Sequence, residues 1–382
     1  MDLKIGIVGL PNVGKSTLFN ALTQKGVPAE NYPFCTIDPS VGVVGVPDAR
    51  LQKLTELSHS AKTIPAAIEF VDIAGLVKGA AEGAGLGNQF LQHIRETDAI
   101  AEVVRIFEDA DISHVEEGQI DPVRDIEIIN LELVLADLQS VTKRLASVEK
   151  DAKKGAPSTG SKNSPQAGSG QAKQAVAEQA ALRKVEQTLS AGKLASSGNL
   201  SDVERFALRA MHLLTMKPIM YVLNKKAGGH NLDEMNDERY QKLIAFLDDM
   251  HAVYVKVDAA IEGELQDVAG EDKENLRREF GVLDDGINDL IKAGYRLLGL
   301  ITFLTTGEDE TRAWTISEGS TAPEAGAAIH SDFREKFIRA EVVPYMELLE
   351  AGSFARAREK GWVRTEGKEY IVKDGDVIEF KI

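Results

Sequence analysis

The feature that most constrains this chain is a phosphate-loop signature close to its N-terminus. Residues 9–16 read G-L-P-N-V-G-K-S, which matches G-x-x-x-x-G-K-[ST]. The apolar run at residues 3–8 predicts a strand before the signature, and residues 17–22 predict the start of a helix after it. In this context, backbone N–H groups and the helix N-terminus surround the phosphates of a nucleotide. The sequence therefore predicts an α/β domain that binds a nucleoside triphosphate.

Three side chains of this loop have predicted tasks. The Lys15 ammonium is expected to reach the β- and γ-phosphates and to support hydrolysis, and the Ser16 hydroxyl is expected to bind a magnesium ion. Asn12 has two interpretations. Its side-chain carbonyl either holds a monovalent cation, such as potassium, beside the bond that is cleaved, or only stabilises the loop.

Two downstream segments carry further candidate magnesium ligands. Residues 67–75 read as a buried strand that ends in D-x-x-G, and Asp72 at its carboxyl end is predicted to hold the ion through water. Thr36 lies in the irregular, proline-containing stretch at residues 26–37. Its hydroxyl is a candidate to complete the magnesium shell when the γ-phosphate is present, and the alternative is a plain loop threonine.

The group that orients the attacking water is a separate question. Ras-like GTPases have a glutamine directly after D-x-x-G, but this chain has Leu76, whose side chain cannot polarise water. His114 is a candidate, because a histidine accepts or orients a proton near neutral pH. The competing interpretation of His114 is an exposed loop histidine.

Two further strand ends are predicted to face the base of the nucleotide. One apolar strand pattern ends at Asn224 and continues into Lys225, as in the N-K-x-D element of GTPases. The aspartate of that element accepts hydrogen bonds from guanine, but this chain has Ala227 at its position, which removes the main reason to prefer guanine. The last predicted core strand leads into a turn at Asp258 and Ala259, which is expected to lie against the base.

A long helical insertion is predicted after Pro122. Its apolar residues recur at alternating steps of three and four, which is the spacing of a coiled-coil seam. The seam residues are Leu131, Val134, Leu138, Val141, Leu145 and Val148. A second helical stretch follows a segment rich in Gly, Ser and Pro at residues 156–171, so the two helices are expected to form an antiparallel hairpin.

This insertion differs in charge from the chain as a whole. Residues 143–193 contain ten basic and four acidic residues, a net charge of +6, whereas the whole chain has a net charge of −16. A protein this acidic does not coat nucleic acid with its entire surface. The local basic arm predicts contact with RNA, and the alternative is an ordinary solvated helix surface.

Composition sets the class and the compartment. Apolar residues make up 43% and charged residues 27% of the 382 residues, which is typical of a globular protein with two or three domains. The single cysteine, Cys35, excludes an intrachain disulfide, and no apolar run is long enough to cross a membrane, so the predicted location is the cytoplasm. From residue 299, short strands and turns predict a small mixed α/β module, with a hairpin turn at residues 373–376.

Several uncommon strings occur together in this chain. They are L-P-N-V-G-K-S-T, N-Y-P-F-C-T-I, D-I-A-G-L-V and R-T-E-G-K-E-Y-I-V-K-D-G-D-V-I-E-F. Through them the chain resembles the YchF-type Obg-like ATPases over nearly its whole length. The resemblance implies an α/β fold in which a P-loop NTPase G domain carries an inserted antiparallel coiled-coil arm and a C-terminal β-grasp (TGS) domain. The implied bounds are 1–124 and 205–300 for the G domain, 125–204 for the arm and 301–382 for the TGS-like domain.

The resemblance also implies a set of site residues. Phosphate binding falls on Asn12, Val13, Gly14, Lys15, Ser16 and Thr17. Magnesium binding falls on Ser16 and Thr36, and a histidine proposed for hydrolysis in the family matches His114. One position departs from the family pattern, because the glutamate of its N-x-x-E element is replaced here by Ala227.

The predicted function is slow, magnesium-dependent ATP hydrolysis by a ribosome-associated regulatory factor that switches with its nucleotide. The predicted partners are ATP and the ribosome or one of its subunits, with RNA contacted by the basic arm and the C-terminal domain, and no membrane. Two alternatives remain. One is a GTPase of the Obg type, and the other is a non-catalytic adaptor that binds RNA and keeps the nucleotide as a structural ligand.

Overall fold

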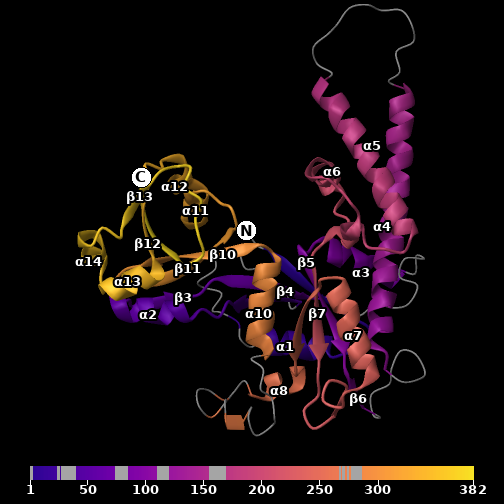
Figure 1. Ribbon diagram of the computed structural model, residues 1–382, viewed down its shortest axis with the longest axis horizontal. Helices are drawn as coiled ribbons and strands as arrows, with labels where there is room; N and C mark the ends of the chain where they lie inside the picture. The colour runs from indigo at the N-terminus through magenta and orange to yellow at the C-terminus, as the bar shows by residue number, and fades with distance from the viewer. Residues whose placement is uncertain are drawn as a thin grey trace, which may run out of the picture.

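The computed structural model shows two β-sheet domains and a projecting pair of long helices (Figure 1). The structure describes residues 3–23, 26, 40–73, 85–109, 120–154, 169–265, 268, 272, 275–276 and 286–382. The predictions for Thr36, Leu76 and His114 fall outside these residues and stay predictions.

The first domain is built on a six-stranded sheet with the strand order β2-β4-β1-β5-β7-β9. Neighbouring strands are parallel except β2 and β4, which are antiparallel. The strands are β1 (Lys4–Val8), β2 (Val41–Gly45), β4 (Ala67–Asp72), β5 (Ala99–Arg105), β7 (Ile219–Asn224) and β9 (Val253–Val257). Ile5, Ile7 and Val8 of β1 are fully buried, as expected for a central parallel strand that is covered on both faces.

Helices cover both faces of this sheet. They are α1 (Lys15–Thr23), α3 (Gly85–Arg95), α7 (Glu238–Asp249), α8 (Ala259–Glu264) and α10 (Gly286–Leu297). Alternate residues of β7 show the two layers, because Met220 and Val222 belong to the core that includes α10, whereas Tyr221 and Leu223 belong to the core that includes α7. A short antiparallel pair, β6 (Phe107–Glu108) and β8 (His230–Asn231), lies beside this domain.

The carboxyl ends of the parallel strands place the predicted site. The phosphate loop follows β1, while β4 ends at Asp72 and β7 ends at Asn224. Because β4, β1, β5 and β7 are neighbours in the sheet, these ends lie at one edge of the domain, where ligands bind in open α/β sheets.

The predicted insertion is a helical hairpin that projects from the first domain (Figure 1). Helix α4 (Pro122–Lys154) packs against α5 (Ser169–Ser190), and the two share a buried apolar core. The ion pairs Arg144–Glu178, at 2.7 Å, and Arg183–Glu149, at 3.1 Å, join the two helices. Leu131, which the seam pattern places inside, is 52% exposed, because the hairpin core begins one helical turn later.

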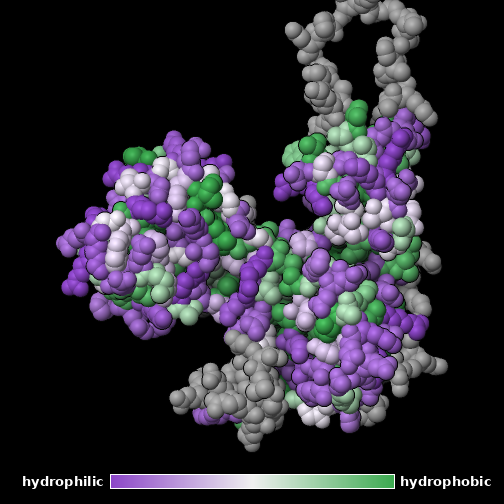
Figure 2. Space-filling model, viewed as in Figure 1, coloured by the Kyte–Doolittle hydropathy of each residue, from purple (hydrophilic) through white to green (hydrophobic). Residues whose placement is uncertain are grey.

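Short helices return the chain from the arm to the sheet. They are η3 (Ala195–Ser197), α6 (Asp202–Leu208), η4 (Arg209–Met211) and η5 (Leu214–Met216). The buried Asp137 of α4 fixes this return, because it accepts hydrogen bonds from the Leu214 N–H at 3.1 Å and the Thr215 N–H at 2.8 Å. Figure 2 shows the arm above the first domain and the C-terminal domain to its left, with a gap between the two.

The C-terminal domain has a second mixed sheet. The strands that it contributes are β10 (Leu300–Thr306), β11 (Glu310–Ser317), β12 (Arg339–Pro344), β13 (Arg364–Glu366) and β14 (Asp376–Lys381). Its helices are α11 (Ala322–Ile329), α12 (Ser331–Glu335), α13 (Tyr345–Ala351) and α14 (Phe354–Glu359). The predicted turn at residues 373–376 exists, but the hairpin is wrong, because β14 pairs with β12 and β10 while Ile371 bridges to Thr321.

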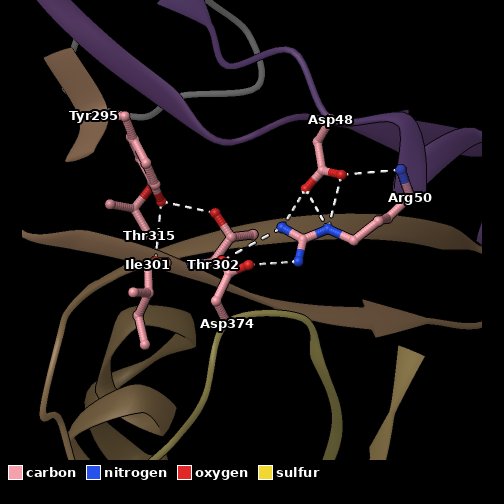
Figure 3. A network of polar contacts seen from close by, with 7 residues as sticks. All are labelled: Asp48, Arg50, Tyr295, Ile301, Thr302, Thr315 and Asp374. Atoms are coloured by element: carbon pink, nitrogen blue, oxygen red, sulfur yellow. Dashed lines mark hydrogen bonds and ion pairs between the residues drawn. The ribbon is translucent and has the colours of Figure 1, made fainter. Parts of the chain in front are cut away.

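A segment of the first domain completes this second sheet. This segment contributes β3 (Lys62–Ile64), which forms one edge of the sheet and pairs in parallel with β11. Helix α2 (Ala49–Ser58) packs beside β3. Figure 3 shows how the guanidinium of Arg50 on α2 lies between two carboxylates, those of Asp48 and Asp374. The sequence pattern did not predict this connection. Within the described ranges, no helix combines the length and the hydrophobicity needed to cross a membrane.

Candidate nucleotide-binding site

The phosphate loop has a backbone that only certain residues allow. Gly14 has a φ of 97°, and a Cβ atom at this position would lie 2.2 Å from the Nδ2 atom of Asn224. Asn12 has a φ of 64°, in the left-handed region that asparagine tolerates better than most residues. Glycine at position 14 thus serves two purposes, since it permits the turn and leaves room for Asn224.

Lys15 is buried inside the loop at the start of α1. Its ammonium donates to the Leu10 carbonyl oxygen at 2.7 Å, and the residue is only 8% exposed. Burial lowers the pKa of Lys15, and the nearby charge of Asp72 partly opposes this effect. The loop carbonyl therefore holds the ammonium in the place from which it is predicted to contact phosphate.

Ser16 and Asp72 bring together the oxygen atoms that a hard cation prefers. The Ser16 hydroxyl donates to Asp72 Oδ2 at 3.2 Å, and the other carboxylate oxygen, Oδ1, is buried and has no hydrogen-bond partner among the described residues. Such an orphaned oxygen fits a magnesium ion or a water molecule bound to it. Among the residues that the structure describes, no cluster of three or more metal-binding side chains exists.

Asn224 connects the phosphate loop to the predicted base-binding turn. Its Nδ2 group donates to the Val13 carbonyl oxygen at 2.8 Å, and its Oδ1 atom accepts from the Ala259 N–H at 3.2 Å. The residue is 4% exposed. Asn224 thus fixes the distance between two loops. The sequence did not reveal this task, because both partners are backbone atoms.

Lys225 is held by two acidic residues. Its ammonium lies 2.6 Å from Glu234 and 3.3 Å from Asp233. Burial acts to lower the pKa of Lys225, but the hydrogen bonds and the attraction to these two carboxylates outweigh it and raise the pKa. The side chain is therefore a fixed positive charge that follows directly after Asn224.

Asp258 caps the short helix α8 on the opposite side of the turn. Its Oδ1 atom accepts from the Ile261 N–H at 3.1 Å, and its Oδ2 atom accepts from the Ala227 N–H. Burial raises the pKa of Asp258, while these backbone hydrogen bonds and the charge of Lys225 act in the opposite direction.

The structure brings most of the predicted site residues to one edge of the sheet. Val13 is buried, whereas Asn12 in the loop and Ser16 and Thr17 at the start of α1 are exposed. The missed participants are the carbonyl groups of Leu10 and Val13, which carry no side-chain signal in the sequence.

Known proteins resemble this chain along its full length. A protein of Bacillus subtilis named "Ribosome-binding ATPase YchF" is 50% identical over 381 residues, which covers 100% of this chain and 99% of that protein. The protein of the same name from Haemophilus ducreyi is 46% identical, with the same coverage. The solved structure of the Schizosaccharomyces pombe YchF GTPase is 37% identical and has a TM-score of 0.84, covering 100% of this chain and 98% of that one.

The fold and the phosphate loop define a P-loop NTPase with a G domain. Residues 4–143 match the family model MMR_HSR1, described as "50S ribosome-binding GTPase", and residues 300–382 match YchF-GTPase_C, described as "Protein of unknown function (DUF933)". The chain belongs to the YchF family. The predicted resemblance and the predicted α/β fold are confirmed.

Proposed function

We propose that this protein is a slow, magnesium-dependent ATPase that works as a nucleotide-dependent switch on the ribosome. The observation that carries the proposal is the arrangement of Lys15, Ser16 and Asp72. An ammonium held by a loop carbonyl lies near a hydroxyl and a carboxylate, and one oxygen of that carboxylate is buried with no partner in the part of the chain that the structure describes. A divalent cation bound to a phosphate chain would supply a partner for the Asp72 carboxylate oxygen, and the phosphates would supply negative charge for the ammonium.

Each of these groups has a defined part in the proposed reaction. Lys15 exchanges the Leu10 carbonyl for phosphate oxygens, and its burial strengthens that attraction. Ser16, Asp72 acting through water, and Thr36 when the γ-phosphate is present would hold a magnesium ion, and this ion would neutralise the charge of the phosphates. The oxygen of water bonds to the γ-phosphorus, the bond to the β,γ-bridging oxygen breaks, and the proton of the water is released.

Two residues are proposed to assist this step. Leu76 cannot orient water, so we assign that task to His114, whose imidazole is able to accept or orient a proton near neutral pH. Asn12 lies exposed in the phosphate loop, and we assign to its side-chain carbonyl the binding of a potassium ion close to the phosphates.

ATP is the proposed substrate, with GTP use as the second candidate. The relatives that share about half of the residues are named ATPases, whereas the match at residues 4–143 is to a GTPase family. Ala227 favours ATP, because the position has no carboxylate to accept the N–H groups of guanine.

The proposed partner is the ribosome, in the cytoplasm. Relatives named "Ribosome-binding" match the entire chain, and the basic arm carries the charge that RNA attracts. The C-terminal domain is the second proposed contact with RNA.

The test is phosphate release from ATP and from GTP, with and without magnesium, potassium and ribosomes. We expect slow release from ATP that requires magnesium and increases with ribosomes. Lys15→Ala should abolish it, while Lys53→Ala, an exposed lysine of α2, should not change it. Absence of release in every condition contradicts the ATPase proposal. If, in addition, Lys15→Ala leaves ribosome binding unchanged, the result supports the alternative of a non-catalytic adaptor.

A further inference from the structure

The position that lacks the aspartate of the N-K-x-D element still has a carboxylate beside it. Ala227 occupies this fourth position, and its backbone N–H donates to Asp258 Oδ2. Asp258 comes from the turn after β9, 31 residues away in the sequence. A carboxylate therefore reaches the backbone of the residue that has no carboxylate of its own.

Asp258 lies at the end of the proposed nucleotide site that is predicted to hold the base, away from the phosphates. The residue after it, Ala259, donates to Asn224, and Asn224 donates to the phosphate loop at Val13. Lys225, directly after Asn224, lies close enough for its charge to act on Asp258. In the proposed site, the base lies between the loop after β7 and the turn after β9. These two segments thus meet at the Asp258 carboxylate.

The hydrogen bonds already made by Asp258 limit what else it can accept. A carboxylate offers about four acceptor positions, and backbone N–H groups of Ala227, Ala260 and Ile261 use part of them. The remaining capacity suits one amino group better than the paired N1–H and N2–H donors of guanine, which require both oxygens at once.

We propose that Asp258 determines the base specificity of this site by accepting a hydrogen bond from the 6-amino group of adenine. It replaces the acceptor that is missing at position 227. A guanine base would turn a carbonyl oxygen toward the carboxylate, and two acceptors that face each other repel. Asp258 is 5% exposed, so little water competes for the hydrogen bond that we assign to its carboxylate. This inference rests on the proposed nucleotide binding and specifies the base.

The experiment compares ATP with purine riboside 5′-triphosphate, which has a hydrogen atom in place of the 6-amino group. We expect the full-length protein to bind ATP more tightly by roughly 10- to 100-fold, the range for a hydrogen bond to a charged group. Asp258→Ser removes the carboxylate but keeps a residue that caps helices well, and it should bring the ratio of the two affinities close to one. Asp237→Ser is the control, because Asp237 is also the N-cap of a helix, α7, but lies outside the site, and it should keep the wild-type ratio.

Two results overturn the assignment of Asp258. One is equal binding of the two triphosphates by the wild-type protein, and the other is an unchanged ratio in Asp258→Ser. If that variant does not fold in a thermal melt, Asp258→Asn, which keeps the shape without the charge, must lower the ratio instead. Failure of the wild-type protein to bind any triphosphate is a different result, which contradicts the proposed function itself.

A second variant tests the relationship between the two positions. Ala227→Asp in the Asp258→Ser background restores a carboxylate within an N-K-x-D sequence. We expect this double variant to gain affinity for GTP by about tenfold or more relative to Asp258→Ser. No gain in GTP affinity contradicts the view that the two positions present their carboxylates to the same base.

Discussion

The guanidinium of Arg50 donates to the Asp374 carboxylate at 2.7 Å, across 324 positions of the sequence. Arg50 is on α2, within the connection between β2 and β4, whereas Asp374 precedes β14 in the C-terminal domain. Asp374 also accepts from the Thr302 N–H at 2.9 Å, so the contact reaches the strand β10 (Figure 3). Strand β4, which ends at Asp72, therefore follows closely in sequence after α2, a helix that is fixed to the second sheet.

Removing Arg50 should weaken the C-terminal domain. We expect Arg50→Ala to lower its free energy of unfolding by about 1–2 kcal/mol, a modest value because the Asp374 side chain is 52% exposed. Urea unfolding followed by tryptophan fluorescence measures this, because both tryptophans, Trp314 and Trp362, lie in that domain. Lys53→Ala, on the exposed side of the same helix, is the control, and equal midpoints for the two variants would contradict the prediction.

The Arg50 contact shows what the sequence could not reveal. The phosphate loop was predictable because its strand, glycines and lysine are adjacent, and their local pattern is specific. The pairing of β3 with β11, and that of Arg50 with Asp374, join segments that are far apart and carry no shared pattern. Only the fold brings such segments together.

The same distinction applies inside the site. Asn224 and Asp258 were predicted beside the base from their places at strand ends, and both lie at the carboxyl edge of the sheet. Their actual partners are the backbone atoms of Val13, Ala259 and Ala227, which have no side-chain signature. The heptad pattern likewise located the arm, but it could not tell that the hairpin core excludes Leu131.

Asn224 should affect nucleotide affinity without affecting base choice. Asn224→Ala removes both of its hydrogen bonds, so the phosphate loop and the base turn lose their connection. We expect ATP and GTP affinities to fall by similar factors, each roughly tenfold. Titration calorimetry with both nucleotides measures this, and the exposed Asn199→Ala is the control. A change in the ATP to GTP ratio would contradict a purely connecting role.

Glu102 should make stability depend on pH. It is fully buried in β5, and both carboxylate oxygens lack a hydrogen-bond partner among the described residues. Burial, together with the charge of Asp125, raises the pKa of Glu102 well above its ordinary value. The folded protein therefore keeps a proton that the unfolded chain releases, and stability falls as pH rises from the ordinary pKa toward the folded one.

Glu102→Gln removes this dependence, because glutamine has no proton to lose. We expect the variant to gain stability over the wild type as pH rises from about 4 to 7, by about 1 kcal/mol or more at pH 7. Urea unfolding at several pH values measures the difference, with the exposed Glu96→Gln as control. A difference that is constant over this pH range would mean that Glu102 ionises normally in the folded protein.

The basic arm should bind the ribosome through charge. Lys143 and Lys150 are exposed on α4, and replacing both with glutamate changes the arm by four charge units without touching its buried seam. We expect weaker ribosome binding and a shallower dependence of affinity on salt, because fewer counterions are released from RNA. Sedimentation with ribosomes at several salt concentrations measures both quantities. Lys53→Glu makes the same kind of charge reversal at one site outside the arm, on α2. An arm variant that behaves like Lys53→Glu would show that the arm is only a solvated surface.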